Sequence, residues 1–239
     1  LIAGPKTIEH MVDTVLYFES DKGNDIRLIR TAKNRYGSTS EIGIFRMTEN
    51  GIQQVPNPSS LFLSKSSFEL SGSSIFPAIE GSRTILLEIQ ALVASSTFST
   101  PKRTVVGWDS SRLSMLLAVF EARCELNFSN SDIYLNIAGG IRTSDPAADL
   151  AVAAALISSK FNLLAPSKAV IFGEINLSGT IRETNNTQAR IKEAKRLGFD
   201  TALISQSATY SSTDDFKLKK VNHLANFMSY LTEFSKPNG

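Results

Sequence analysis

Residues 132–157 read DIYLNIAGGIRTSDPAADLAVAAALI, and this stretch decides the fold. Its first residues, 132–137, alternate between polar and apolar side chains, a period of two that predicts a β-strand. Gly139 and Gly140 interrupt the strand. Asp145 then caps a predicted helix, and Pro146 fits its first position, where no N–H donor is needed. A strand, a glycine turn and an alanine-rich helix are the parts of a catalytic elbow, so the question is whether this elbow carries chemistry.

The composition of the chain is that of an ordinary globular protein. Of the 239 residues, 42% are hydrophobic and 20% are charged. The net charge of +2 is too small to indicate nucleic-acid binding by itself, so any basic patch must be local. The single cysteine, Cys124, excludes a disulfide framework or a cysteine-ligated zinc site within this chain and fits a reducing, cytoplasmic setting. No apolar run approaches the roughly 20 residues of a membrane span, so no membrane partner is expected.

Residues 1–57 form the first expected unit, which has the pattern of an incomplete sheet. Strands are predicted at residues 14–18, 26–32, 41–47 and 52–55, the first of them buried. Asn50-Gly51 lies between the last two and is a strong hairpin signal. Hardly any helix accompanies these strands, so another domain or subunit is expected on the bare face of the sheet. Because the sequence begins with Leu, in mid-pattern, we expect a fragment of a longer protein.

Residues 58–75 form an expected linker and crossing segment, because they are rich in proline and serine and have no period. Residues 76–239 form the second expected unit. Its predicted strands are 84–93, 104–107, 132–137, 168–172 and 201–205; its predicted helices follow Asp109 or Ser110, follow Asp145, and cover 187–197 and 222–234. Strands that alternate with helices predict an α/β or α+β domain.

A basic motif with one aromatic residue lies between two strands of the first unit. It reads Lys33-Asn34-Arg35-Tyr36-Gly37. Two cations on such a loop are able to grip phosphate, either of nucleic acid or of a nucleotide on a neighbouring subunit. The spacing alone favours a solvated basic turn over a phosphate-binding loop.

The motif at 33–37 closely resembles the KNRFG motif of the RadA family (also called Sms), bacterial ATPases of DNA repair and recombination. Tyr36 stands where the family has Phe, which keeps the ring and adds a hydroxyl. Four further segments resemble the same family in the same order: GPKTIEHMVDTVLYFE (4–19), EGSRTILLEIQALV (80–93), AGGIRTSDPAADLAVA (138–153) and FGEINLSGTIR (172–182). The resemblance therefore covers nearly the whole chain.

The resemblance implies a fold for each unit. Residues 1–57 would be the end of a RecA-like ATPase domain, and residues 76–239 a Lon protease-like domain of the ribosomal protein S5 domain 2-like fold. The family's four-cysteine zinc motif and its phosphate-binding loop, GxxxxGK[ST], are absent from this sequence. We therefore expect no cofactor on this chain, whereas the intact protein would use ATP, Mg²⁺ and zinc.

The resemblance also implies a function for the intact protein. It would move along single-stranded DNA, promote branch migration of recombination intermediates, assemble as a homo-oligomeric ring of six subunits and work with the RecA recombinase. Lys6 would lie near DNA, because the mobile loop before its helix lines the central channel of RecA-like rings. Lys33 and Arg35 would lie at the subunit boundary, within reach of DNA or of a neighbour's nucleotide.

Lon proteases use a serine activated by a neutral lysine, and both positions are lost here. By the resemblance, Ala147 occupies the serine position and Gln188 the lysine position. A methyl group cannot attack a carbonyl, and an amide has no useful basicity. We therefore expect a scaffold without hydrolytic activity. Two alternatives stay open: a peptidase with a displaced dyad of Ser144 and Lys192, and a protein-only assembly module that does not contact DNA.

Overall fold

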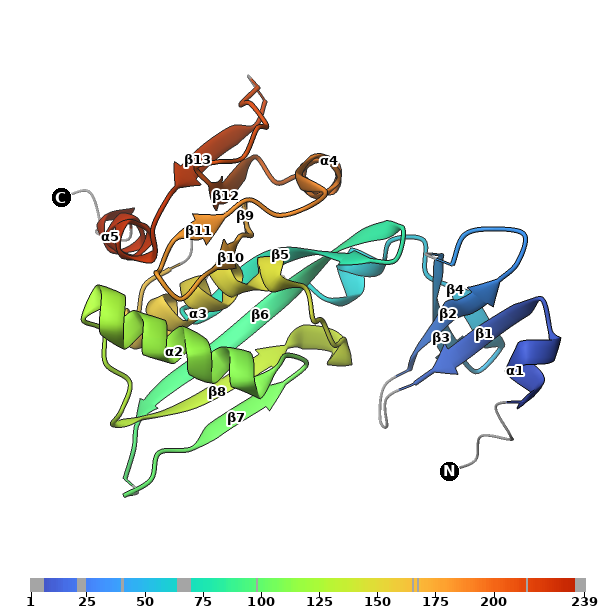
Figure 1. The fold of residues 1–239 in the computed structure, drawn as a ribbon, viewed down its shortest axis with the longest axis horizontal. Coiled ribbons are helices and arrows are strands. Elements are labelled where there is room, and N and C mark those ends of the chain that lie inside the picture. The colour runs from blue at the N-terminus through green and yellow to red at the C-terminus, as the bar shows by residue number, and fades with distance from the viewer. Residues whose placement is uncertain are drawn as a thin grey trace. The chain divides into compact units, whose positions relative to one another are not determined.

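The computed structural model describes residues 7–20, 25–39, 41–63, 70–97, 99–164, 166, 168–213 and 215–234 (Figure 1). Lys6, the expected DNA contact of the channel loop, lies outside these residues. The chain divides into two compact units, one made of residues 1–58 with 79–85 and the other of residues 59–78 with 86–239. Both contain helices and strands, so the predicted mixed α/β class is confirmed.

The first unit contains a four-stranded antiparallel sheet and one short helix. The helix is α1 (Thr7–Met11), and the strands, in spatial order, are β1 (Thr14–Glu19), β2 (Ile26–Asn34), β3 (Ile42–Thr48) and β4 (Gly51–Gln54). Thr48 pairs with Gly51 across the turn between β3 and β4. Gly51 has a φ of 95°, a conformation that glycine adopts at no steric cost. The hairpin predicted from Asn50-Gly51 is therefore confirmed.

The apolar side chains of β1 are exposed, which corrects one prediction. Leu16 is 58% and Phe18 53% exposed, although the run TVLYF predicts a buried strand. Apolar composition indicates that a face is suited to burial, but the burial itself requires a layer that packs against it. β1 is an edge strand, and within the described part of this unit no such layer covers these two residues.

The second unit is built on a mixed four-stranded sheet. Its strands, in spatial order, are β5 (Ser73–Glu80), β6 (Arg83–Ser95), β8 (Ser131–Ile137) and β7 (Arg103–Val106). The turn η1 (Pro58–Leu61) precedes β5. A parallel sheet follows in the order β13 (Lys217–Val221), β12 (Thr201–Ser205) and β9 (Ala169–Ile171). A short antiparallel pair is formed by β10 (Glu174–Ile175) and β11 (Ile181–Arg182).

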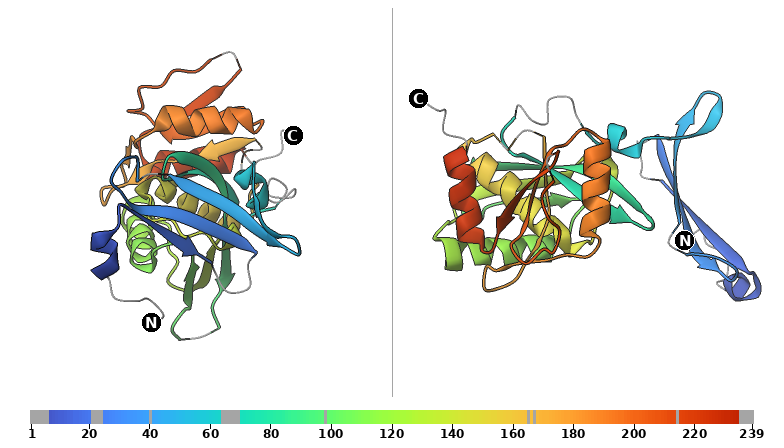
Figure 2. Two further views of the ribbon diagram at one scale, coloured as in Figure 1. Left: turned by 90° about the vertical axis from the view of Figure 1, so that its right-hand side faces the viewer. Right: turned by 90° about the horizontal axis from the view of Figure 1, so that it is seen from above.

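The described residues of the second unit also form the helices α2 (Ser110–Cys124), α3 (Asp149–Phe161), α4 (Thr187–Arg196) and α5 (Leu224–Phe234). Every residue of α3 from Asp149 to Ser158 is buried, as expected for a helix that is apolar on all sides. Figures 1 and 2 show α3 inside the second unit, with its other helices and strands around it. α5 packs against both α2 and α3. Within the described ranges, every helix is too short or too polar to cross a bilayer.

The helix signals of the sequence are borne out in detail. The Asp109 carboxylate accepts the Arg112 N–H at 2.8 Å and caps α2. The Asp145 carboxylate likewise accepts the Ala147 N–H at 3.0 Å. Residues Pro146–Ala148 form a 3₁₀ turn, η3, so the α-helix itself begins at Asp149. Gly198, with a φ of 84°, follows the end of α4.

β13 is an edge strand of the parallel sheet and carries three lysines. Lys217 and Lys219 are exposed, and the Lys219 ammonium lies 4.3 Å from the centre of the Tyr230 ring. The Lys220 ammonium donates to the Ala208 carbonyl at 2.6 Å. Lysines on an edge strand place charge beside its unpaired backbone groups.

Candidate functional site

Ala147, which the resemblance places at the Lon serine position, is fully buried in the elbow. Its carbonyl accepts the Gly173 N–H at 2.9 Å, and the Leu150 N–H donates to the Gly173 carbonyl at 3.1 Å. These two bonds attach the elbow to the segment between β9 and β10. The segment is therefore packed in place, and at position 147 it presents a buried methyl group.

Asp149, at the start of α3, is a buried carboxylate with three hydrogen bonds. It accepts from Arg112 Nε at 2.5 Å, from Arg112 Nη2 at 2.6 Å and from the Ile175 N–H at 2.9 Å. Burial raises the pKa of the Asp149 carboxyl, while the bonds from Arg112 and Ile175 oppose the rise. The bidentate pair connects α2 to α3, and the Ile175 bond connects α3 to β10. Three of the roughly four acceptor sites of the Asp149 carboxylate are thus occupied by structural partners.

Arg190, on α4, was not expected from the sequence, yet it is the largest fully buried polar side chain near the elbow, at 2% exposure. Its Nη2 donates to Asp145 Oδ2 at 2.6 Å and its Nε to the Asn185 carbonyl at 3.1 Å. Its Nη1 donates to the Pro77 carbonyl. Burial lowers the pKa of Arg190, and the Asp145 carboxylate opposes this shift. The arginine joins α4 to the residue that caps η3.

Two aromatic rings enclose the Arg190 guanidinium. Its central carbon lies 5.6 Å from the ring centre of Phe76 and 5.6 Å from that of Phe172. A planar guanidinium is well suited to aromatic faces, because its hydration is weak and the ring quadrupole attracts the cation. The helix that bears Gln188 is therefore held beside the elbow by the Arg190–Asp145 ion pair and by the contacts of Arg190 with the two rings.

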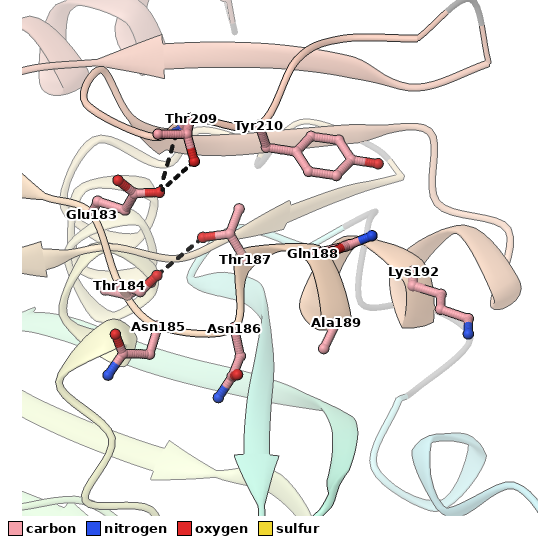
Figure 3. Close-up of a pocket in the computed structure, with 10 residues that line it drawn as sticks. All are labelled: Glu183, Thr184, Asn185, Asn186, Thr187, Gln188, Ala189, Lys192, Thr209 and Tyr210. Carbon is pink, nitrogen blue, oxygen red and sulfur yellow. Dashed lines mark hydrogen bonds between the residues drawn. The ribbon is translucent and has the colours of Figure 1, made fainter.

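Gln188, at the expected lysine position, is exposed and lines an open polar pocket (Figure 3). The pocket is formed by residues 183–189, Lys192, Thr209 and Tyr210, so neither Ala147 nor Ser144 belongs to its lining. Figure 3 shows Gln188 and Lys192 on α4 and Tyr210 on the opposite wall. The structure does not bring Ser144 to the pocket that contains Lys192, which weakens the displaced-dyad alternative.

The side chain of Lys33, in the basic motif, reaches the carboxyl-terminal end of α1. Its ammonium donates to the carbonyls of Glu9 at 3.0 Å, His10 at 3.5 Å and Val12 at 2.7 Å. The last carbonyls of a helix have no partner within the helix and carry a partial negative charge, so they attract a cation. Lys33 and Asn34 belong to β2, and only Arg35 to Gly37 form the expected loop.

Arg35 and Tyr36 are the exposed part of the motif. The Arg35 side chain is 69% exposed and forms a 3.3 Å ion pair with Asp13, which is itself 56% exposed. The Tyr36 ring is 80% exposed and lies 5.8 Å from the Arg35 guanidinium. An ion pair that is open to water is weak, so Arg35 is able to exchange Asp13 for another anion.

Asn34 and Gly37 shape the turn that presents these side chains. Asn34 Nδ2 donates to the Ser38 carbonyl at 3.2 Å, and Asn34 Oδ1 accepts the Tyr36 N–H at 3.4 Å. A Cβ at position 37 would approach Asn34 Nδ2 to 2.7 Å. Glycine is therefore the residue that lets the Asn34 side chain fold over the turn.

Comparison with known proteins agrees with the resemblance of the motifs. A family profile described as "Subunit ChlI of Mg-chelatase" matches residues 91–208, all of which lie in the second unit. The DNA repair protein RadA of Rickettsia typhi is 54% identical over 205 residues, which cover 86% of this chain and 46% of that protein. RadA of Brucella abortus is 48% identical over 229 residues, with coverages of 95% and 49%. RadA of Aquifex aeolicus is 46% identical over 223 residues, with coverages of 93% and 50%.

The chain belongs to the RadA family. The resemblance read from its motifs is thereby confirmed, and the chain is related to DNA-repair proteins along nearly its whole length. It spans about half the length of the curated RadA relatives that it matches.

The residues of this RadA-family chain do not fit the cofactors that the resemblance implies for the intact protein. The sequence contains no GxxxxGK[ST] pattern and only one cysteine. Among the residues that the structure describes, no group of three or more His, Cys, Asp or Glu side chains is placed to hold a metal ion.

Proposed function

We propose that this chain is part of a DNA-repair ATPase of the RadA type, in which the motif at 33–37 contacts the phosphates of single-stranded DNA. The second unit is a scaffold without hydrolytic activity. The intact protein would hydrolyse ATP to move along single-stranded DNA and would promote branch migration together with a RecA recombinase. It would act as a ring, with six subunits as the expected number, and its ATP, Mg²⁺ and zinc would be bound by parts outside this chain.

The single observation that supports DNA contact most strongly is the exposure of Arg35 and Tyr36. A guanidinium in water binds phosphate through two parallel N–H bonds, and an exposed ring offers a stacking surface to an unpaired base. The two groups are adjacent, so one nucleotide is able to meet both. Because the net charge of the chain is only +2, this contact is expected to be local.

The scaffold role of the second unit is supported by the way its elbow is occupied. Ala147 is buried, and Asp145 and Asp149 are paired with Arg190 and Arg112. Buried charges that have fixed partners stabilise one arrangement of the backbone and leave no free base beside the elbow. The pocket that contains Gln188 lacks a hydroxyl from residue 144.

Fluorescence anisotropy with labelled oligo(dT) tests the DNA contact. We expect weak binding at low salt and a several-fold loss of affinity in Arg35→Gln. On single strands each phosphate contact contributes about −0.7 to the slope of log K against log salt, so the slope should become shallower by about that amount.

Arg46→Gln is the matched control, because Arg46 is an exposed cation of β3 in the same unit with no ion pair among the described residues. Equal losses in the two variants would mean that only net charge matters. Absence of detectable binding at low salt would instead favour a protein-only assembly module.

A further inference from the structure

The Lys33 ammonium is directed at backbone carbonyl groups near the end of α1. A lysine ammonium has three N–H groups. The carbonyl oxygens of Glu9 and Val12 accept from Nζ at 3.0 and 2.7 Å, and that of His10 lies at a longer 3.5 Å. A phosphate oxygen that binds Lys33 closely therefore competes with these carbonyls for the N–H groups of Nζ.

The carbonyls that Lys33 holds define the end of α1. α1 ends at Met11, the Val12 N–H donates to the Ile8 carbonyl at a long 3.3 Å, and β1 begins at Thr14. A helix of only five residues is unstable by itself, so its last turn depends on partners from elsewhere in the fold. Lys33 is such a partner, because it belongs to β2, the strand that follows β1 in the chain and pairs with it.

Arg35 differs from Lys33 in this respect. The Asp13 side chain that it contacts is exposed, and the Arg35 guanidinium retains further N–H groups that face solvent. Arg35 is thus available to an incoming anion without any change in the backbone. The two cations of the motif therefore differ: Arg35 is exposed to solvent, whereas Lys33 is bound to backbone carbonyls.

We propose that the basic motif binds phosphate in two steps, in which Lys33 exchanges the α1 carbonyls for the ligand and so releases the end of α1. Arg35 makes the first contact. Lys33 then leaves Glu9, His10 and Val12, and the segment 7–12 loosens while the ligand is bound. The occupancy of the motif is in this way coupled to the segment that precedes β1. This inference rests on the proposed phosphate contact of the motif.

Hydrogen exchange read at the Val12 amide and across the peptide 7–12 tests the coupling, with and without saturating oligo(dT). In the unaltered protein we expect exchange in this segment to become several-fold faster when oligo(dT) binds. In Lys33→Met, which keeps the aliphatic stem, exchange should already be fast without DNA and should not change on binding. The salt slope of this variant should also be shallower by about 0.7.

Two control variants separate the possible failures. Lys217→Met removes an exposed lysine of β13 whose ammonium has no hydrogen bond or ion pair among the described residues, and it should leave exchange at 7–12 unchanged. Arg35→Gln should weaken binding, yet at saturation it should still accelerate exchange at Val12. If oligo(dT) binds in an Arg35-dependent manner but exchange at 7–12 slows or stays constant, the exchange of partners by Lys33 is wrong. If binding is insensitive to Arg35, the phosphate contact itself is wrong.

Discussion

Replacing Arg190 by methionine is the sharpest test of how the elbow is held. The side chain is 2% exposed and the Asp145 side chain 18% exposed. Arg190→Met removes the Arg190 donors from Asp145 Oδ2 and from the carbonyls of Pro77 and Asn185. Removal of one partner of a buried ion pair costs about 3–5 kcal/mol, and the partial exposure of Asp145 lets water return to it. We therefore expect a loss near the lower end, about 3 kcal/mol.

Thermal and urea unfolding measure this loss. For a chain of this size, about 3 kcal/mol corresponds to a fall in Tm of roughly 6–12 °C. Arg182→Met is the matched control, since Arg182 is exposed and has no side-chain partner among the described residues; its effect should stay within about 0.5 kcal/mol. In the double variant Arg190→Met with Asp145→Asn, the total loss should be smaller than the sum of the single losses by about 1 kcal/mol or more. Strictly additive losses, or a loss below about 1 kcal/mol for Arg190→Met, would refute the account of the elbow as an Arg190-dependent structure.

Three further outcomes are expected. Gly72→Ala should cost about 3 kcal/mol or more in unfolding experiments, because φ is +83° and the new Cβ would lie 2.3 Å from the Ala91 carbonyl oxygen; Gly198→Ala, at φ +84° with open space, should cost only about 1–2 kcal/mol. The hydrogen bonds from Ser111 and from the Arg112 N–H lower the pKa of the Asp109 carboxyl. The contribution of Asp109 to stability is therefore present above its unfolded pKa and is lost as pH falls through its folded pKa. Asp109→Asn should flatten the dependence of Tm on pH in the acid range, and an unchanged profile would contradict the capping role. Incubation with a casein-like substrate should yield no cleavage, and cleavage that disappears in both Ser144→Ala and Lys192→Ala would establish the displaced dyad instead.

The sequence predicts best those features whose cause is local. Asn50-Gly51 gives the β3–β4 turn, Asp109 gives the start of α2 and Gly198 gives the stop of α4, since each acts on backbone groups within a few residues. β13 was missed for the opposite reason. Its alternation is hidden by lysines, and its strand geometry comes from parallel pairing with β12, which no neighbouring residue indicates.

The candidate site shows the same division. The motif at 33–37 is recognised from its sequence. Its contacts are not predictable in this way, because the carbonyls that bind Lys33 lie 21 to 24 residues earlier in the chain. Arg190 lies on a helix rich in cations, and its residue type does not indicate burial. The available signal was its spacing: Ala194 follows four residues later, so the two side chains lie on the same face of α4.

The lysines of β13 have a consequence for crowded conditions. A strand with unpaired backbone groups is a template on which another copy adds its own strand, and that reaction leads from orderly association to fibrous deposits. Two copies that approached each other through β13 would bring Lys217 and Lys219 of one against the same ammonium groups of the other. Repulsion of like charges at that edge permits many copies to be held close together without their sheets fusing.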